Sequence, residues 1–189
     1  MQDAIDRLRA ALAAYARQWP AEAATAALFA DFLAEAPAAF SRAHPPGHFT
    51  GSAWLVSADG RRALLTHHRK LGRWLQPGGH ADGDADLARV ALREAEEESG
   101  LVGLRQPGGL FDLDRHLIPA RGDEPAHWHY DLRYVVCAAP AAEAFVVSAE
   151  SHALAWRPVA ELAQGRGEDP SIRRMAAKWL ARGAPPERD

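Results

Sequence analysis

The sequence predicts an α/β sandwich with a mixed β-sheet, preceded by an N-terminal helical extension. Two observations lead to this fold class. Residues 3–35 carry apolar side chains at helical spacing, whereas strand-like segments separated by turn residues begin near Phe49. A strongly helical segment, residues 86–99, interrupts those strands. Helices and strands mixed in this way pack as layers around one core.

The N-terminal segment predicts two helices, residues 3–18 and 21–35, with Pro20 between them. Their expected buried side chains are Ile5, Leu8, Leu12, Tyr15, Leu28, Phe29, Phe32 and Leu33. We therefore expect a helical extension over residues 1–45 and a domain over residues 46–189 that includes the C-terminal helix. Two roles are open for the extension: it caps the core, or it serves dimerisation or substrate selection.

The remaining elements follow from local patterns. Residues 49–57 and 63–68 flank the turn Ala58-Asp59-Gly60, which favours a hairpin. A short extended segment, residues 74–76, is expected to stop at Pro77-Gly78-Gly79. Further strands are expected at 101–115, 127–138 and 153–157, then a helical turn at 159–163 and a closing helix at 171–182.

Composition excludes several classes of protein. The 189 residues hold 22 basic and 25 acidic side chains, a net charge of −3, which disfavours a binder of nucleic-acid polymers or membrane surfaces. The single cysteine, Cys137, rules out an internal disulfide. We find no apolar run long enough for a transmembrane helix and no signal-peptide pattern, and so expect a cytoplasmic protein.

The most informative segment is the acidic helix, where residues 94–98 include four glutamates. A charge run of this kind is commonly a solvated helix face. With Leu87 at zero and about 100° per residue, however, Glu94, Glu97 and Glu98 fall at about −20°, −80° and +20°, on the side of the apolar stripe. Burial of three carboxylates requires a neutralising partner. From the helix alone, two partners remain open: divalent cations with oxygen ligands, or an arginine network that includes Arg93.

Gly79 together with Arg93-Glu94-Ala95-Glu96-Glu97-Glu98-Ser99-Gly100-Leu101 resembles the Nudix box, G-x5-E-x7-R-E-U-x-E-E-x-G-U, where U is aliphatic. The strand and turn at 74–79 and the late segment 155–162 are also similar to that family, so the resemblance covers about residues 48–166. Ala85 stands where the first glutamate of the box is expected. The resemblance implies a Nudix-type α/β/α sandwich.

The resemblance implies a pyrophosphohydrolase that uses Mg²⁺ or Mn²⁺ to cleave a diphosphate linkage in a nucleoside diphosphate derivative. Glu94, Glu97 and Glu98 would be the metal ligands and Arg93 would orient them. Glu150 is the candidate general base, although a solvated loop acid is an equal interpretation. Two alternatives remain: a nucleotide-binding module with a weakened site, motivated by Ala85, and, ranked lower, a prenyl diphosphate isomerase. A small-molecule diphosphate is the expected partner, and domains of this family often form homodimers.

Residues next to the box are candidates for substrate contacts. Gly78 and Gly79 would shape the turn at which substrate approaches, and His80 would contact phosphate or brace that turn. His127 and His129 share one face of a predicted strand with Asp131, because side chains alternate along a strand. These two histidines would contact substrate or ligate a metal, or they would form a plain polar wall.

Overall fold

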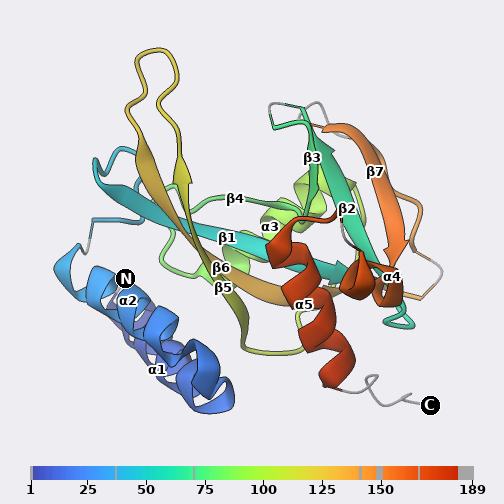
Figure 1. Ribbon diagram of the computed structural model, residues 1–189, viewed down its shortest axis with the longest axis horizontal. Helices are drawn as coiled ribbons and strands as arrows, with labels where there is room; N and C mark the ends of the chain where they lie inside the picture. Colours follow the sequence, from blue (N-terminus) through green and yellow to red (C-terminus); the bar gives the residue numbers. More distant parts are fainter. Residues whose placement is uncertain are drawn as a thin grey trace. The chain divides into compact units, whose positions relative to one another are not determined.

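The structure, a computed structural model, describes residues 2–36, 38–69, 71–140, 142–147, 151–165 and 167–182 (Figure 1). Its helices are α1 (Gln2–Gln18), the short 3₁₀ helix η1 (Pro20–Glu22), α2 (Ala23–Glu35), α3 (Leu87–Ser99), α4 (Val159–Gln164) and α5 (Pro170–Ala181). Its strands are β1 (Gly47–Val56), β2 (Arg62–His68), β3 (Arg73–Leu75), β4 (Gly78–His80), β5 (Leu110–Ile118), β6 (His127–Cys137) and β7 (Ser151–Pro158).

The strands form one seven-stranded sheet with the order β3-β2-β1-β6-β5. Strand β4 also pairs with β1, and β7 pairs with β2. The predicted hairpin is confirmed, because β1 and β2 pair antiparallel with Val56 opposite Ala63. A mixed α/β fold preceded by two helices is therefore present, as the sequence predicts.

The chain divides into two compact units. The first comprises Met1–Ser52, Gly78–Ala91 and Gly108–Tyr134; the second comprises Ala53–Pro77, Leu92–Pro107 and Val135–Asp189. Three of the five dividing positions fall within β1, α3 and β6, and the other two precede β4 and β5.

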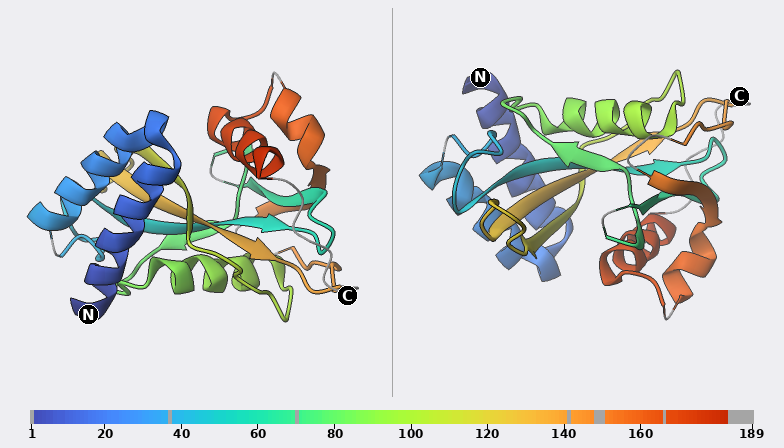
Figure 2. Two further views of the ribbon diagram at one scale, coloured as in Figure 1. Left: turned by 90° about the horizontal axis from the view of Figure 1, so that it is seen from below. Right: turned by 90° about the horizontal axis from the view of Figure 1, so that it is seen from above.

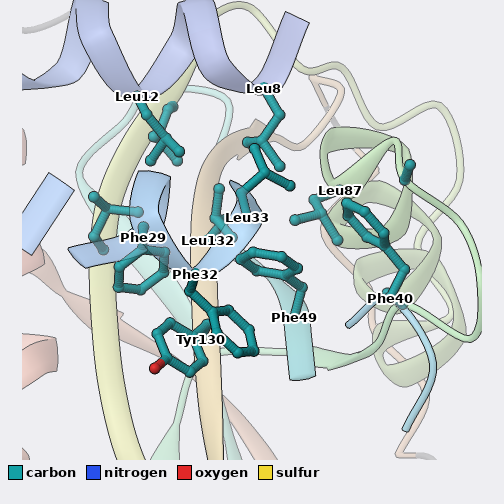
Figure 3. Close-up of a cluster of buried hydrophobic side chains, with 14 of the residues drawn as sticks. Leu8, Leu12, Phe29, Phe32, Leu33, Phe40, Phe49, Leu87, Tyr130 and Leu132 are labelled. Atoms are coloured by element: carbon teal, nitrogen blue, oxygen red, sulfur yellow. The ribbon is translucent and has the colours of Figure 1, made fainter. Parts of the chain in front are cut away.

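The first unit is held together by an apolar cluster that joins the N-terminal helices to the sheet. Helices α1 and α2 lie side by side in Figure 1, and their buried side chains point toward the strands in Figure 3. The Phe32 ring stacks on Tyr130 with centroids 3.8 Å apart, and Phe29 meets Tyr130 edge-on at 5.2 Å. Phe49 of β1 and Leu132 of β6 complete this core. The helical extension thus packs as a cap on the strands of its own unit.

The second unit has a separate apolar cluster built on β1, β2, β6 and β7, with Leu55, Leu64 and Val136 at its centre. In both views of Figure 2, α5 and residues 92–99 of α3 lie on opposite sides of the strands. Asp169 caps α5 by accepting a hydrogen bond from the Ser171 amide at 2.9 Å, and Pro170 occupies the first turn.

The structure differs from the predicted elements in three details. Leu28 is exposed, because it lies on the outer side of α2. The strand expected from residue 101 begins at Leu110, and the segment before it makes only an isolated bridge, Arg105 to Cys137. Strand β3 does end before Pro77, as expected, but residues 78–80 form a further strand, β4, that was not expected; the glycines allow its close pairing with β1. Among the described helices, none is long and apolar enough to cross a membrane.

Candidate functional site

The acidic helix α3 places its glutamates in different environments. Its apolar side chains Leu87, Val90 and Ala91 are buried, as the sequence predicts. The Glu98 side chain continues that stripe and is only 8% exposed, whereas Glu94 is half-buried. A carboxylate kept that far from water needs charged or polar partners to remain ionised.

Glu97 does not follow the predicted stripe. Its side chain is 62% exposed, so the expectation of three buried carboxylates is wrong for this residue. The reason is its angle of about −80° from Leu87, which lies at the margin of the stripe where the helix surface meets solvent. The helix therefore presents one buried, one half-buried and one accessible carboxylate.

Arg93 links two of these carboxylates. Its Nη2 donates to Glu94 Oε1 at 2.9 Å, and its Nε lies 3.8 Å from Glu97 Oε1. The i to i+4 contact is the one that the sequence predicts for Arg93 and Glu97. A guanidinium shared in this way holds the two carboxylates in position, and their oxygen atoms suit a hard divalent cation.

A second polar region lies on one face of the sheet in the first unit. The alternation expected on β6 is present: His127, His129 and Asp131 share this face, while Tyr130 and Leu132 belong to the apolar cluster on the other. Asp131 accepts hydrogen bonds from two β1 hydroxyls, Thr50 Oγ1 at 2.9 Å and Ser52 Oγ at 2.8 Å. This face is therefore tied across neighbouring strands by side-chain hydrogen bonds.

Arg133 is the buried cation of this face. Its guanidinium contacts three carboxylates: Asp131 at 2.7 Å, Asp112 at 3.3 Å and Asp114 at 3.3 Å. Burial alone would lower the pKa of the Arg133 guanidinium, but the three carboxylates raise the pKa overall. The guanidinium stays charged and fixes the carboxylates of β5 and β6.

Histidines gather at the end of the same face. His48 of β1, His80 of β4 and His129 of β6 each offer a ring nitrogen, and these atoms all lie within 4.8 Å of one another. The ring of His48 is centred 4.7 Å from that of His129 and 5.0 Å from that of His80. His127 lies beside them, with its Nε2 3.3 Å from Nε2 of His129.

The rings of His48, His80 and His129 are neutral at neutral pH. Burial, reinforced by the neighbouring histidines, lowers the pKa of His48 from 6.5 to about 4 and lowers the pKa of His129 further. Burial also lowers the pKa of His80. Neutral imidazoles supply no positive charge to a phosphate, but they hydrogen-bond and they ligate metals.

The glycines at the start of the box, Gly78 and Gly79, serve strand pairing. A Cβ on Gly78 would lie 2.1 Å from Ser52 Oγ and 2.9 Å from Ser52 Cα, so only glycine lets β4 approach β1 here. Gly79 stands opposite Gly51 in the same antiparallel ladder. The pair therefore positions β4, the strand that carries His80.

Two of the predicted residues lie outside these groups. Ala85 is buried beside a hollow of about 540 Å³ whose other lining residues include Asp84, Asp86 and Arg89. Glu150, the candidate general base, lies outside the described residues. Sequence analysis did not single out His48, although His48, Thr50 and Ser52 alternate along an otherwise apolar strand and this polar alternation was a usable signal.

Comparison with family models decides the relationship that the box suggests. The NUDIX domain model matches residues 48–179, well over half of the chain. The chain belongs to the Nudix family. It is an enzyme of the Nudix pyrophosphohydrolase class, whose members act on diphosphate linkages. Among curated proteins, none matches the chain significantly.

Solved structures agree with this assignment. A NUDIX family hydrolase from Clostridium perfringens is 25% identical, with a TM-score of 0.51 over 71% of this chain and 96% of that one. The Ap4A hydrolase of C. elegans, solved as a binary complex, is 16% identical with a TM-score of 0.54, covering 70% and 95%. The NUDIX domain of Shewanella oneidensis NrtR, complexed with ADP ribose, is 21% identical with a TM-score of 0.50, covering 81% and 97%. The last two show that the Nudix fold is shared.

Proposed function

We propose that this Nudix enzyme hydrolyses a diphosphate linkage in a nucleoside diphosphate derivative and requires Mg²⁺ or Mn²⁺. The observation that carries the proposal is the arrangement on α3. Arg93 holds Glu94 and Glu97, and the buried Glu98 follows on the same helix, at the box positions that bind metal in the family.

The donor set fits a hard cation. The three glutamates offer only carboxylate oxygens, and Mg²⁺ and Mn²⁺ prefer oxygen ligands. When bound, such an ion would offset the negative charge of the diphosphate and prepare a water molecule for attack.

The chain's own residues have distinct tasks in this proposal. Arg93 orients Glu94 and Glu97 through its shared guanidinium. Glu97 is accessible to a hydrated cation from solvent, whereas burial gives Glu98 a fixed position. Glu150 stays the predicted general base, and Gly78 and Gly79 keep the backbone close at the entry to the box. Contacts of His80, His127 and His129 with substrate also stay predictions, as do the homodimer and the cytoplasmic location.

The test is a screen of diphosphate compounds with Mg²⁺, with Mn²⁺ and with excess chelator. Nucleotide sugars, dinucleoside polyphosphates such as Ap4A, ADP-ribose and modified nucleoside triphosphates form the panel. We expect turnover of at least one compound class, abolished by the chelator. Glu97→Gln and Glu98→Gln should each lower kcat by orders of magnitude while the far-UV spectrum is unchanged.

Glu96→Gln is the matched control, because Glu96 lies on the same helix, is exposed and occupies a variable box position. It should retain wild-type kcat. Full activity in Glu98→Gln, or activity that survives complete removal of divalent metal, would contradict the proposal.

The second candidate, a nucleotide-binding module, rests on Ala85 in place of the first box glutamate. Calorimetry separates the two functions, since tight binding of a nucleotide without product release supports the module. The isomerase interpretation requires a reactive cysteine, and burial raises the pKa of the Cys137 thiol, which disfavours the nucleophilic thiolate.

A further inference from the structure

The histidine group on the sheet of the first unit shares no residue with the box glutamates. We propose that His48, His80 and His129 form a second metal site, specific for Zn²⁺ or a similar transition-metal ion. This site would be additional to the Mg²⁺ or Mn²⁺ of the proposed hydrolysis, and it does not depend on that proposal.

The donor chemistry selects this class of metal. Three imidazoles offer nitrogen ligands, which suit Zn²⁺, Ni²⁺, Co²⁺ and Cu²⁺ rather than the oxygen-seeking Mg²⁺. Three histidines are also a known protein ligand set for zinc, with the fourth position left to water or another ligand. The lone pairs are available because the rings are neutral at neutral pH.

The spacing of the rings is close to that of a bound ion. The three candidate ligand atoms lie within 4.8 Å of one another. Tetrahedral ligands at about 2.0–2.1 Å from zinc are roughly 3.4 Å apart. Each nitrogen therefore needs to move by about 1 Å or less, a shift that a small rotation of an imidazole side chain supplies.

The strongest single observation is the burial of His48. Its side chain is 1% exposed, and neither of its ring nitrogens has a hydrogen-bond partner among the described residues. A buried polar group left in that state costs on the order of 1–3 kcal/mol, so native structures rarely retain one without a ligand or water. A metal ion held with His80 and His129 would accept the lone pair of one of these nitrogens.

His127 lies beside the three rings and is held by the backbone. Its Nδ1 donates to the Pro125 carbonyl at 2.9 Å, which fixes the orientation of the ring. Its Nε2 lies 3.3 Å from Nε2 of His129, within hydrogen-bonding distance of that ring. An imidazole whose second nitrogen donates to a fixed acceptor is the usual arrangement of a metal-ligating histidine. His127 is thus a positioning residue.

The strands determine what the metal would do. His48 and His80 come from the paired strands β1 and β4, where Thr50 stands opposite His80, and His129 comes from β6. An ion bound to all three would cross-link these strands directly beside Gly78 and Gly79. We therefore expect bound Zn²⁺ to raise the melting temperature of the protein.

The experiment is calorimetric titration of Zn²⁺ into chelator-treated full-length protein in the presence of excess Mg²⁺. We expect one tight site in the wild type. His48→Gln, His80→Gln and His129→Gln should each lower the affinity for Zn²⁺ by roughly 100-fold or more. Loss of a residue that only hydrogen-bonds to a metal ligand can already lower metal affinity by about 100-fold. Titration with Co²⁺ gives a second readout, because four-coordinate cobalt absorbs strongly in the visible range.

His67→Gln and His152→Gln are the matched controls, since these rings pair with each other at 5.6 Å on other strands. Both variants, and Glu98→Gln, should bind Zn²⁺ like the wild type. The proposal is overturned if the wild type binds no Zn²⁺ in excess Mg²⁺. It is also overturned if His80→Gln, a change at a half-buried position, folds normally and keeps full affinity for Zn²⁺. Loss of Zn²⁺ binding in Glu98→Gln alone would place the ion at the box glutamates instead.

Discussion

Replacing Arg133 by methionine should destabilise the protein strongly. The substitution keeps the apolar stem but removes the cation that contacts Asp131 at 2.7 Å and both Asp112 and Asp114 at 3.3 Å. The Arg133 side chain is 3% exposed and that of Asp112 is fully buried, so water cannot replace the guanidinium. Breaking a buried pair from one side costs about 3–5 kcal/mol.

Urea denaturation followed by tryptophan fluorescence measures this loss. With a slope of about 2 kcal/mol per molar urea, the midpoint should fall by roughly 1.5–2.5 M. Arg133→Lys should lie between the two proteins, because an ammonium keeps the charge but cannot contact three carboxylates at once. Arg115→Met is the control: Arg115 is exposed and lies over the Trp128 ring at 3.8 Å, a contact worth about 0.5–1 kcal/mol. A midpoint for Arg133→Met within about 0.5 M of the wild type would refute the reasoning.

Three other predictions concern packing and pH. Gly78→Ala should lower the free energy of unfolding in urea by about 1–3 kcal/mol or more, because its Cβ would overlap Ser52. Gly108→Ala should be nearly neutral, because its Cβ meets nothing within 4 Å, and equal costs for the two variants would contradict the close approach of β4. Phe32→Ala should lower the free energy of unfolding by about 3–5 kcal/mol in the same assay, whereas Leu28→Ala, at an exposed position of the same helix, should change it by about 0.5 kcal/mol or less. A small loss of stability in Phe32→Ala would show that α2 does not contribute to the core. In chelator, the melting temperature should fall as the pH drops from 6.5 toward 4, because the unfolded chain binds a proton on His48 that the folded chain binds only near pH 4. His48→Gln should flatten this dependence on pH, and an unchanged slope would contradict the lowered pKa of the buried His48.

Most helices could be predicted from the sequence because their signals are local. The spacing of Ile5, Leu8 and Leu12 identifies α1, and Pro170 marks the first turn of α5. The faces of β6 followed from alternation alone. Strand β4 could not be predicted in this way, because Pro77-Gly78-Gly79 has the composition of a turn and its pairing with β1 is a long-range contact.

The candidate site was predictable to a similar degree. The order of residues in the box identifies Arg93 and its glutamates. The helical wheel, however, does not show how wide the buried side of the helix is, so the prediction that Glu97 is buried was wrong. The histidine group depends on strand order. His48 and His129 are far apart in sequence, and only the sheet brings their rings to 4.7 Å.

The most direct test of the metal-binding role of α3 is Mn²⁺ binding, measured by electron paramagnetic resonance without any substrate. We expect Mn²⁺ to bind to the wild type, Glu96→Gln and His129→Gln with similar affinity, and to bind much more weakly to Glu98→Gln. Wild-type Mn²⁺ affinity in Glu98→Gln, with its fold intact, would contradict the assignment of the box glutamates as the site of the divalent ion.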